Sequence, residues 1–94
     1  MGHELSVLRE RIDKTDEDFI AYLAARTQIV TEIAEYKIKN NQPIVQREIE
    51  NQRLERIMQL AREAGLDPEF ARAVYYTIIL GSSCMEIQIQ ESSK

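Results

Sequence analysis

Three basic residues, Arg9, Arg26 and Lys37, lie on one stretch of sequence that is otherwise patterned as the apolar seam of a helix. Steps of three and four residues connect the positions Leu5, Leu8, Ile12, Thr15, Phe19, Tyr22, Arg26, Ile29, Ile33 and Tyr36. Such positions normally carry apolar side chains, so a cation at Arg26 needs an anion. Lys37 follows eleven residues later, about three helical turns, and therefore points the same way. Two aligned cations predict a pocket for a small polyanion.

Further polar groups lie on later faces of the sequence that we expect to be buried. Glu50 is in line with apolar residues at helical spacing, and Gln46 lies one turn before it. Ser82 and Glu86 share a second stripe of this kind. A buried carboxylate requires a cation or a hydrogen-bond donor. The predicted partners of these carboxylates are the two aligned cations.

Glycine and proline divide the chain into helices, and no strand-like alternation of useful length occurs. The predicted helices span residues 4–39, residues 46 or 47 to 64, and residue 67 to near the C-terminus. Pro43 follows the first helix, Gly65 follows the second, and Asp67 is the expected N-cap of the third. We therefore expect an all-α fold in a single domain, residues 1–94.

The composition restricts the classes of partner. The chain has 44% hydrophobic and 30% charged residues, a net charge of −4 and one cysteine, Cys84. This acidic balance repels nucleic acid and anionic membranes, so neither is an expected partner. No apolar run approaches the length of a membrane span, and a lone cysteine cannot form an intramolecular disulfide. We expect a cytoplasmic protein.

The length of the first helix predicts the quaternary structure. About 35 residues form a rod of roughly 50 Å, whereas a compact domain of this size is only about 30 Å across. The seam in the far half of the rod needs a second copy to cover it, which predicts an intertwined helical homodimer. Arg9 lies too far from Arg26 and Lys37 to share their pocket within one chain. In an antiparallel two-fold pairing, Arg9 of one copy can reach the pocket of the other.

The chain resembles a known family over nearly its whole length. The first helix carries the pattern Leu8-Arg9-Glu10-Arg11-Ile12-Asp13, Asp16, Phe19-Ile20, Leu23, Arg26 and Ile33-Ala34-Glu35-Tyr36-Lys37. Pro43-Ile44, Glu50 and Leu66-Asp67 continue it at matching spacing. Together these residues resemble the all-helical class of chorismate mutases.

The resemblance implies the Claisen rearrangement of chorismate to prephenate, the branch step toward phenylalanine and tyrosine, with no cofactor and no metal. It implies that Arg26 and the second copy's Arg9 bind the two carboxylates of chorismate, with a further contact from Ser82. Lys37 donates to the ether oxygen, and Glu50 holds the substrate hydroxyl. A unimolecular rearrangement of this kind needs a fixed reactive conformer and donors at the developing charge, not a nucleophile or base.

Three positions depart from the family pattern. The usual aspartate and arginine early in the second helix are replaced by Gln46 and Ile49. Bacterial members commonly have glutamine where this chain has Glu86, whereas fungal members have glutamate. A glutamate can donate a hydrogen bond to the ether oxygen beside Lys37 only when it is protonated. We therefore expect an activity that rises toward acidic pH.

Two further hypotheses remain, one from these departures and one from the seam. The first is a related activity on 4-amino-4-deoxychorismate or isochorismate, since an ammonium group suits the neighbourhood of Glu50 and an ionised Glu86. The second is a non-catalytic helical dimerisation module, in which Arg26 sets the register of the seam and no pocket exists.

Overall fold

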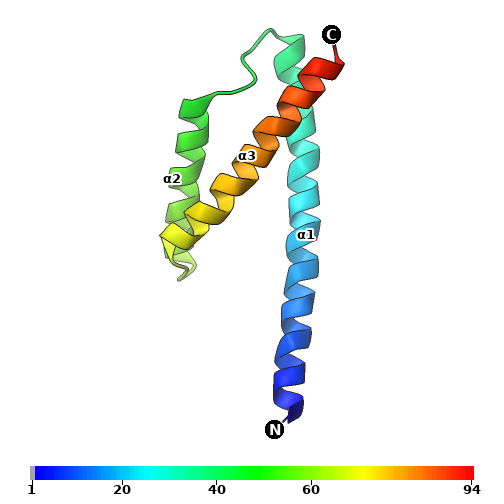
Figure 1. Cartoon of the computed structure of the whole chain (residues 1–94). Helices are drawn as coiled ribbons and strands as arrows, with labels where there is room; N and C mark the ends of the chain where they lie inside the picture. Colours follow the sequence, from blue (N-terminus) through cyan, green and yellow to red (C-terminus); the bar gives the residue numbers. More distant parts are fainter. Residues whose placement is uncertain (1) are drawn as a thin grey trace.

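The computed structural model describes residues 2–94, with side chains from Glu4 onward, and it contains three helices in the described part. Helix α1 spans Gly2–Lys39, α2 spans Arg47–Glu63 and α3 spans Pro68–Ser92 (Figure 1). No strand interrupts the described residues. The predicted all-α class is confirmed, and each predicted boundary lies within two residues of the observed one.

Local sequence signals explain the ends of α2 and α3. Gly65 adopts a φ of 75° after α2, and the Leu66 amide donates to the Ala61 carbonyl at 2.8 Å. This closing bond is typical of a helix that ends on a left-handed glycine. The Asp67 side chain accepts from the Glu69 amide at 3.1 Å and caps α3, with Pro68 in the first turn. The connection is therefore a tight turn that sends α3 back along α2.

Helix α3 is the central element of the chain. It packs against both α1 and α2, whereas α1 and α2 do not pack on each other within the described residues (Figure 1). The buried apolar residues are mostly small or β-branched, and they are Val30, Ala34, Ile44, Leu54, Ala61, Ala71 and Ile79. Because the outer helices diverge, a cavity lies between them with α3 beneath it.

A stripe of small residues, not the predicted seam, packs α1 within the chain. Val30 and Ala34 are buried, and Leu23 and Thr27 continue the same stripe toward the N-terminus as half-buried residues. Small side chains let two helices approach closely. The large apolar seam residues on the neighbouring face, such as Ile29, stay about half exposed. The seam thus stays accessible within this chain, and Ile29 and Ile33 line the cavity.

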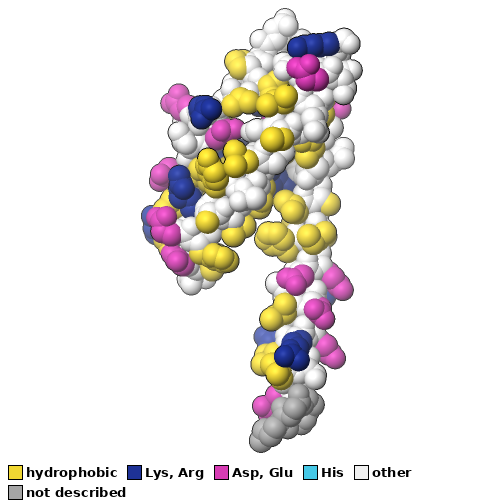
Figure 2. Space-filling model, viewed as in Figure 1, with side chains coloured by type: hydrophobic (Ala, Val, Ile, Leu, Met, Phe, Trp, Pro, Cys, Tyr) yellow, Lys and Arg dark blue, Asp and Glu magenta, His cyan; other side chains and the backbone are white. Residues whose placement is uncertain are grey.

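The N-terminal half of α1 projects beyond the other helices (Figure 1). All described side chains from residue 4 to residue 22 are exposed, and Figure 2 shows apolar side chains along this arm. The chain extends 59 × 26 × 15 Å with a radius of gyration of 17.0 Å, compared with about 12 Å for a compact domain of this length. No helix in the described part is long and apolar enough to cross a membrane.

Candidate active site

A cavity of about 330 Å³ lies between the three helices. All three helices contribute polar side chains that the sequence predicts for the site. Six of the seven predicted site residues line it, namely Arg26, Lys37, Gln46, Glu50, Ser82 and Glu86. The seventh, Arg9, lies on the exposed arm of α1 and is absent from this chain's own cavity. The volume suits a small organic molecule.

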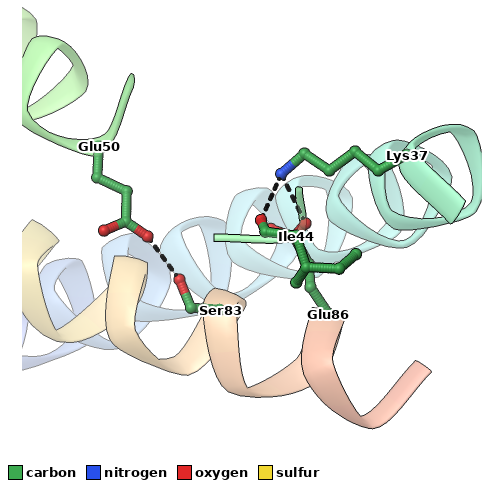
Figure 3. Close-up of polar contacts among 5 residues, drawn as sticks. All are labelled: Lys37, Ile44, Glu50, Ser83 and Glu86. Carbon is green, nitrogen blue, oxygen red and sulfur yellow. Dashed lines mark hydrogen bonds and ion pairs between the residues drawn. The ribbon is translucent and has the colours of Figure 1, made fainter. Parts of the chain in front are cut away.

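Lys37 is held at one end of the cavity by two acceptors (Figure 3). Its Nζ donates to Glu86 Oε2 at 2.9 Å and to the Ile44 carbonyl at 2.8 Å. Both side chains of the ion pair are nearly buried, with 12% and 11% of their surfaces exposed. An ammonium has three donors, so one N–H of Lys37 remains for a ligand. The Ile44 carbonyl fixes the position of this donor through the loop before α2.

Arg26 is fixed from α3 rather than from its own helix. Its Nη1 donates to Ser82 Oγ at 2.6 Å, and Ser82 Oγ donates in turn to the Ile78 carbonyl at 2.9 Å. The guanidinium carbon lies 6.0 Å from the centre of the Tyr75 ring, within the range of a cation–π contact. Because the Ser82 proton is committed to Ile78, Ser82 acts here as an acceptor that orients Arg26. The other guanidinium N–H groups remain for a carboxylate.

Glu50 faces α3 across the cavity and accepts a hydrogen bond from Ser83 Oγ at 2.7 Å (Figure 3). Gln46, the residue that precedes α2 as its N-cap, also lines the cavity and is half-buried. The cavity therefore holds hydrogen-bond acceptors and an amide as well as cations.

Comparison with known proteins agrees with this geometry. Residues 8–88 match the family model described as chorismate mutase type II. This chain belongs to the chorismate mutase type II family. Chorismate mutases are isomerases of aromatic amino acid biosynthesis, and the resemblance found in the sequence is confirmed. The three-helix architecture is also consistent with this family.

Similar proteins include enzymes named bifunctional chorismate mutase/prephenate dehydratase. The one from Buchnera aphidicola subsp. Schizaphis graminum is 35% identical over 77 residues, which cover 82% of this chain and 20% of that protein. The one from Aquifex aeolicus is 34% identical over 87 residues, which cover 90% of this chain and 24% of that protein. The chain thus spans about a fifth to a quarter of the length of these relatives.

Three contributors to this chorismate mutase-type cavity were missed in the sequence. Ser83 binds Glu50, the Ile44 carbonyl binds Lys37, and Arg53 lines the cavity beside Glu50 on α2. Arg53 could have been found, because it lies three residues after Glu50 and seven after Gln46, on one helical face. The Ile44 carbonyl had no sequence signal, since a backbone acceptor carries no residue type.

Proposed function

We propose that this chain is a chorismate mutase that converts chorismate to prephenate. One observation carries the proposal: a nearly buried Lys37 ammonium, fixed by Ile44 and Glu86, shares a cavity with the oriented guanidinium of Arg26. In this rearrangement the ether C–O bond breaks as a new C–C bond forms within the same molecule. No atom enters or leaves, so the reaction needs neither a nucleophile nor a cofactor.

The side chains divide the work by position. Arg26 binds a substrate carboxylate and selects the chair-like conformer, in which the two reacting carbons lie close together. Lys37 donates to the ether oxygen, where negative charge develops as the C–O bond breaks. Glu50 accepts from the ring hydroxyl, and Gln46, which lines the same cavity at the N-cap of α2, contributes an amide to the site. Because the Lys37 donor is fixed before the substrate arrives, little reorganisation opposes the transition state.

We further propose that the active form is an intertwined homodimer. The exposed arm of α1 carries large apolar residues such as Leu8, Ile12 and Phe19, with 49%, 60% and 49% of their surfaces exposed. The cavity is also open on one side, because the apolar residues Ile29, Ile33 and Ile49 line it and yet keep 42–56% of their surfaces exposed. The arm of a second copy would cover both surfaces and bring its Arg9 to the open side.

The dimer makes a direct prediction for the mass of the protein in solution. Sedimentation equilibrium should return twice the mass of one chain, because the arm cannot be covered within one chain. Ile12→Glu should shift the equilibrium toward monomer, since it places a charge on that apolar surface. Lys14→Glu, an exposed change on the same arm, is the matched control and should stay dimeric. A monomeric wild-type protein at micromolar concentration would contradict the proposal.

Glu86→Gln tests the role of Glu86 beside the ether oxygen. In the structure the Glu86 side chain accepts from Lys37 at 2.9 Å. A glutamine amide in its place can accept from Lys37 through its oxygen and donate to the ether oxygen through its nitrogen. We therefore expect Glu86→Gln to keep or raise kcat/KM. A large loss of kcat/KM in a variant that keeps the wild-type melting temperature would contradict this role.

A related substrate is the second candidate function. Glu50 presents a carboxylate to the cavity and no arginine occupies position 49, which suits the ammonium of 4-amino-4-deoxychorismate. Comparing kcat/KM for chorismate, isochorismate and 4-amino-4-deoxychorismate, with product identification, separates these activities. We expect chorismate to be preferred. A preference for either of the others would move the assignment to that substrate within the same family.

We propose a cytoplasmic enzyme in which residues 1–94 form one chorismate mutase domain. The exposed thiol of Cys84 supports a reducing compartment. Cell fractionation followed by the chorismate assay tests this location, and activity confined to an extracellular fraction would contradict it.

A further inference from the structure

We propose that Arg53, which lines the cavity on α2, binds a substrate carboxylate. The proposal deepens the proposed function, because it assigns a further contact in the same site.

The position of Arg53 on α2 carries the first part of the argument. Arg53 lines the cavity together with Ile49 and Glu50 on the same face of the helix. Helical side chains lean toward the N-terminus and cover the surface of the preceding turn. The guanidinium of Arg53 can therefore reach the cavity surface beside Ile49.

The packing of α2 against α3 sets the level of Arg53 in the cavity. Glu50 contacts Ser83 at 2.7 Å, and the tight turn before α3 makes the two helices antiparallel (Figure 1). Moving one turn forward on α2 thus corresponds to moving one turn back on α3, toward Ser82 and Ile79. Ser82 is the residue that holds Arg26. Arg53 accordingly lies toward the Arg26 end of the cavity, away from Lys37.

The charges of the lining give Arg53 a specific role. At one end Lys37 is paired with Glu86 at 2.9 Å. At the other end Arg26 and Glu50 carry opposite charges, so within one chain Arg53 is the group that makes the net charge of this end positive. Arg53 forms no ion pair and no side-chain hydrogen bond within the described residues. Its five N–H donors are thus not engaged by the protein itself.

The test compares Arg53→Ala with Arg56→Ala. Arg53 and Arg56 are both exposed arginines of α2, but Arg56, one turn further along, does not line the cavity. Arg56→Ala therefore controls for the general loss of a positive charge from this helix. Two readouts are needed: KM and kcat with chorismate, and calorimetric binding of a stable bicyclic dicarboxylic acid that mimics the chair-like transition state. Monomethyl esters of the same diacid, one for each carboxyl group, show which carboxylate is involved.

We expect Arg53→Ala to weaken diacid binding roughly 10- to 100-fold, as the loss of a charged hydrogen bond predicts, and to raise KM for chorismate in step. One of the two monoesters should bind wild type and Arg53→Ala with similar affinity, because its esterified carboxyl group is the one that Arg53 contacts in the diacid. Arg56→Ala should stay within about twofold of wild type. Arg53→Lys should recover part of the affinity, since it keeps the charge and loses the planar fork. Melting temperatures should agree among all variants, because Arg53 has no partner of its own within the described residues.

Failure of this inference is separable from failure of the proposed function. If wild type isomerises chorismate and Arg53→Ala stays within about twofold in both readouts, the role of Arg53 is overturned and the function stands. If wild type binds the diacid through Arg53 but leaves chorismate unchanged, the site assignment stands and the proposed function fails. If Arg53→Ala and Arg56→Ala lose diacid affinity equally, the effect comes from the overall positive charge of α2, and the specific contact of Arg53 is overturned.

Discussion

Replacing Lys37 by alanine should lower kcat for chorismate by roughly 100- to 1,000-fold, the usual effect of removing one preorganised donor from a developing oxyanion. The ammonium is placed by two fixed acceptors, Glu86 and the Ile44 carbonyl, and no other cation shares that end of the cavity in the described chain. Water cannot replace it equally well, because a mobile dipole must reorganise as charge develops. Steady-state kinetics with chorismate gives the effect directly, and KM should change less than kcat.

Two controls separate this catalytic loss from misfolding. Lys37→Ala leaves the nearly buried Glu86 without its cation, a change that costs about 3–5 kcal/mol of stability when a buried pair is broken. Combining Lys37→Gln with Glu86→Gln removes both charges, so its kcat should be low while its melting temperature stays near that of wild type. Lys39→Ala, an exposed change in the last turn of α1, should be fully active. A kcat for Lys37→Ala within tenfold of wild type would contradict the role of Lys37.

Subunit mixing should restore activity between two inactive variants. Arg9→Ala and Arg26→Ala should each lower kcat/KM by roughly 100-fold, since each removes a charged contact to a carboxylate. In a mixed dimer, one site combines the intact Arg26 of the first chain with the intact Arg9 of the second. The other site lacks both arginines. An equal mixture after subunit exchange should therefore recover about a quarter of the wild-type activity, because about half of the dimers are mixed.

This result depends on the shared site and not on dimerisation alone. Mixing Arg26→Ala with Lys37→Ala is the matched control, because each chain supplies both Arg26 and Lys37 to its own cavity. Every site in that mixture lacks one of the two groups, so activity should stay low. Recovery in the control, or no recovery when Arg9→Ala is mixed with Arg26→Ala, would contradict the assignment of Arg9 to the neighbouring copy's site.

The sequence predicted the helices well because their signals are local. Gly65 and Asp67 act on the turn that contains them, so the boundary between α2 and α3 could be read directly. The alignment of Arg26 with Lys37 also followed from helical geometry alone, and both residues line the cavity. In contrast, the choice between two neighbouring stripes of α1 depends on close approach by α3. The large apolar seam was conspicuous in the sequence, whereas the smaller Val30 and Ala34 are the buried residues.

The details of the candidate site were less predictable for a related reason. Glu86 was expected near a cation, and the pairing with Lys37 follows that expectation. The use of Ser82 as an acceptor for Arg26 depends on its simultaneous donation to Ile78, which no spacing rule specifies. The Ile44 carbonyl reaches Lys37 because the loop after α1 folds back by a particular path. Backbone acceptors and hydroxyl orientations are products of tertiary structure, so they can be assigned only in three dimensions.

The most direct test of the central claim is the ultraviolet absorbance of chorismate incubated with the purified chain, with identification of the product and Arg26→Ala as the control. We predict enzyme-dependent conversion to prephenate and a rate near background for Arg26→Ala. If chorismate, isochorismate and 4-amino-4-deoxychorismate all stay unchanged, and a chorismate-like dicarboxylate at millimolar concentration leaves the melting temperature unaltered, the catalytic account is wrong and the chain is a helical dimerisation module.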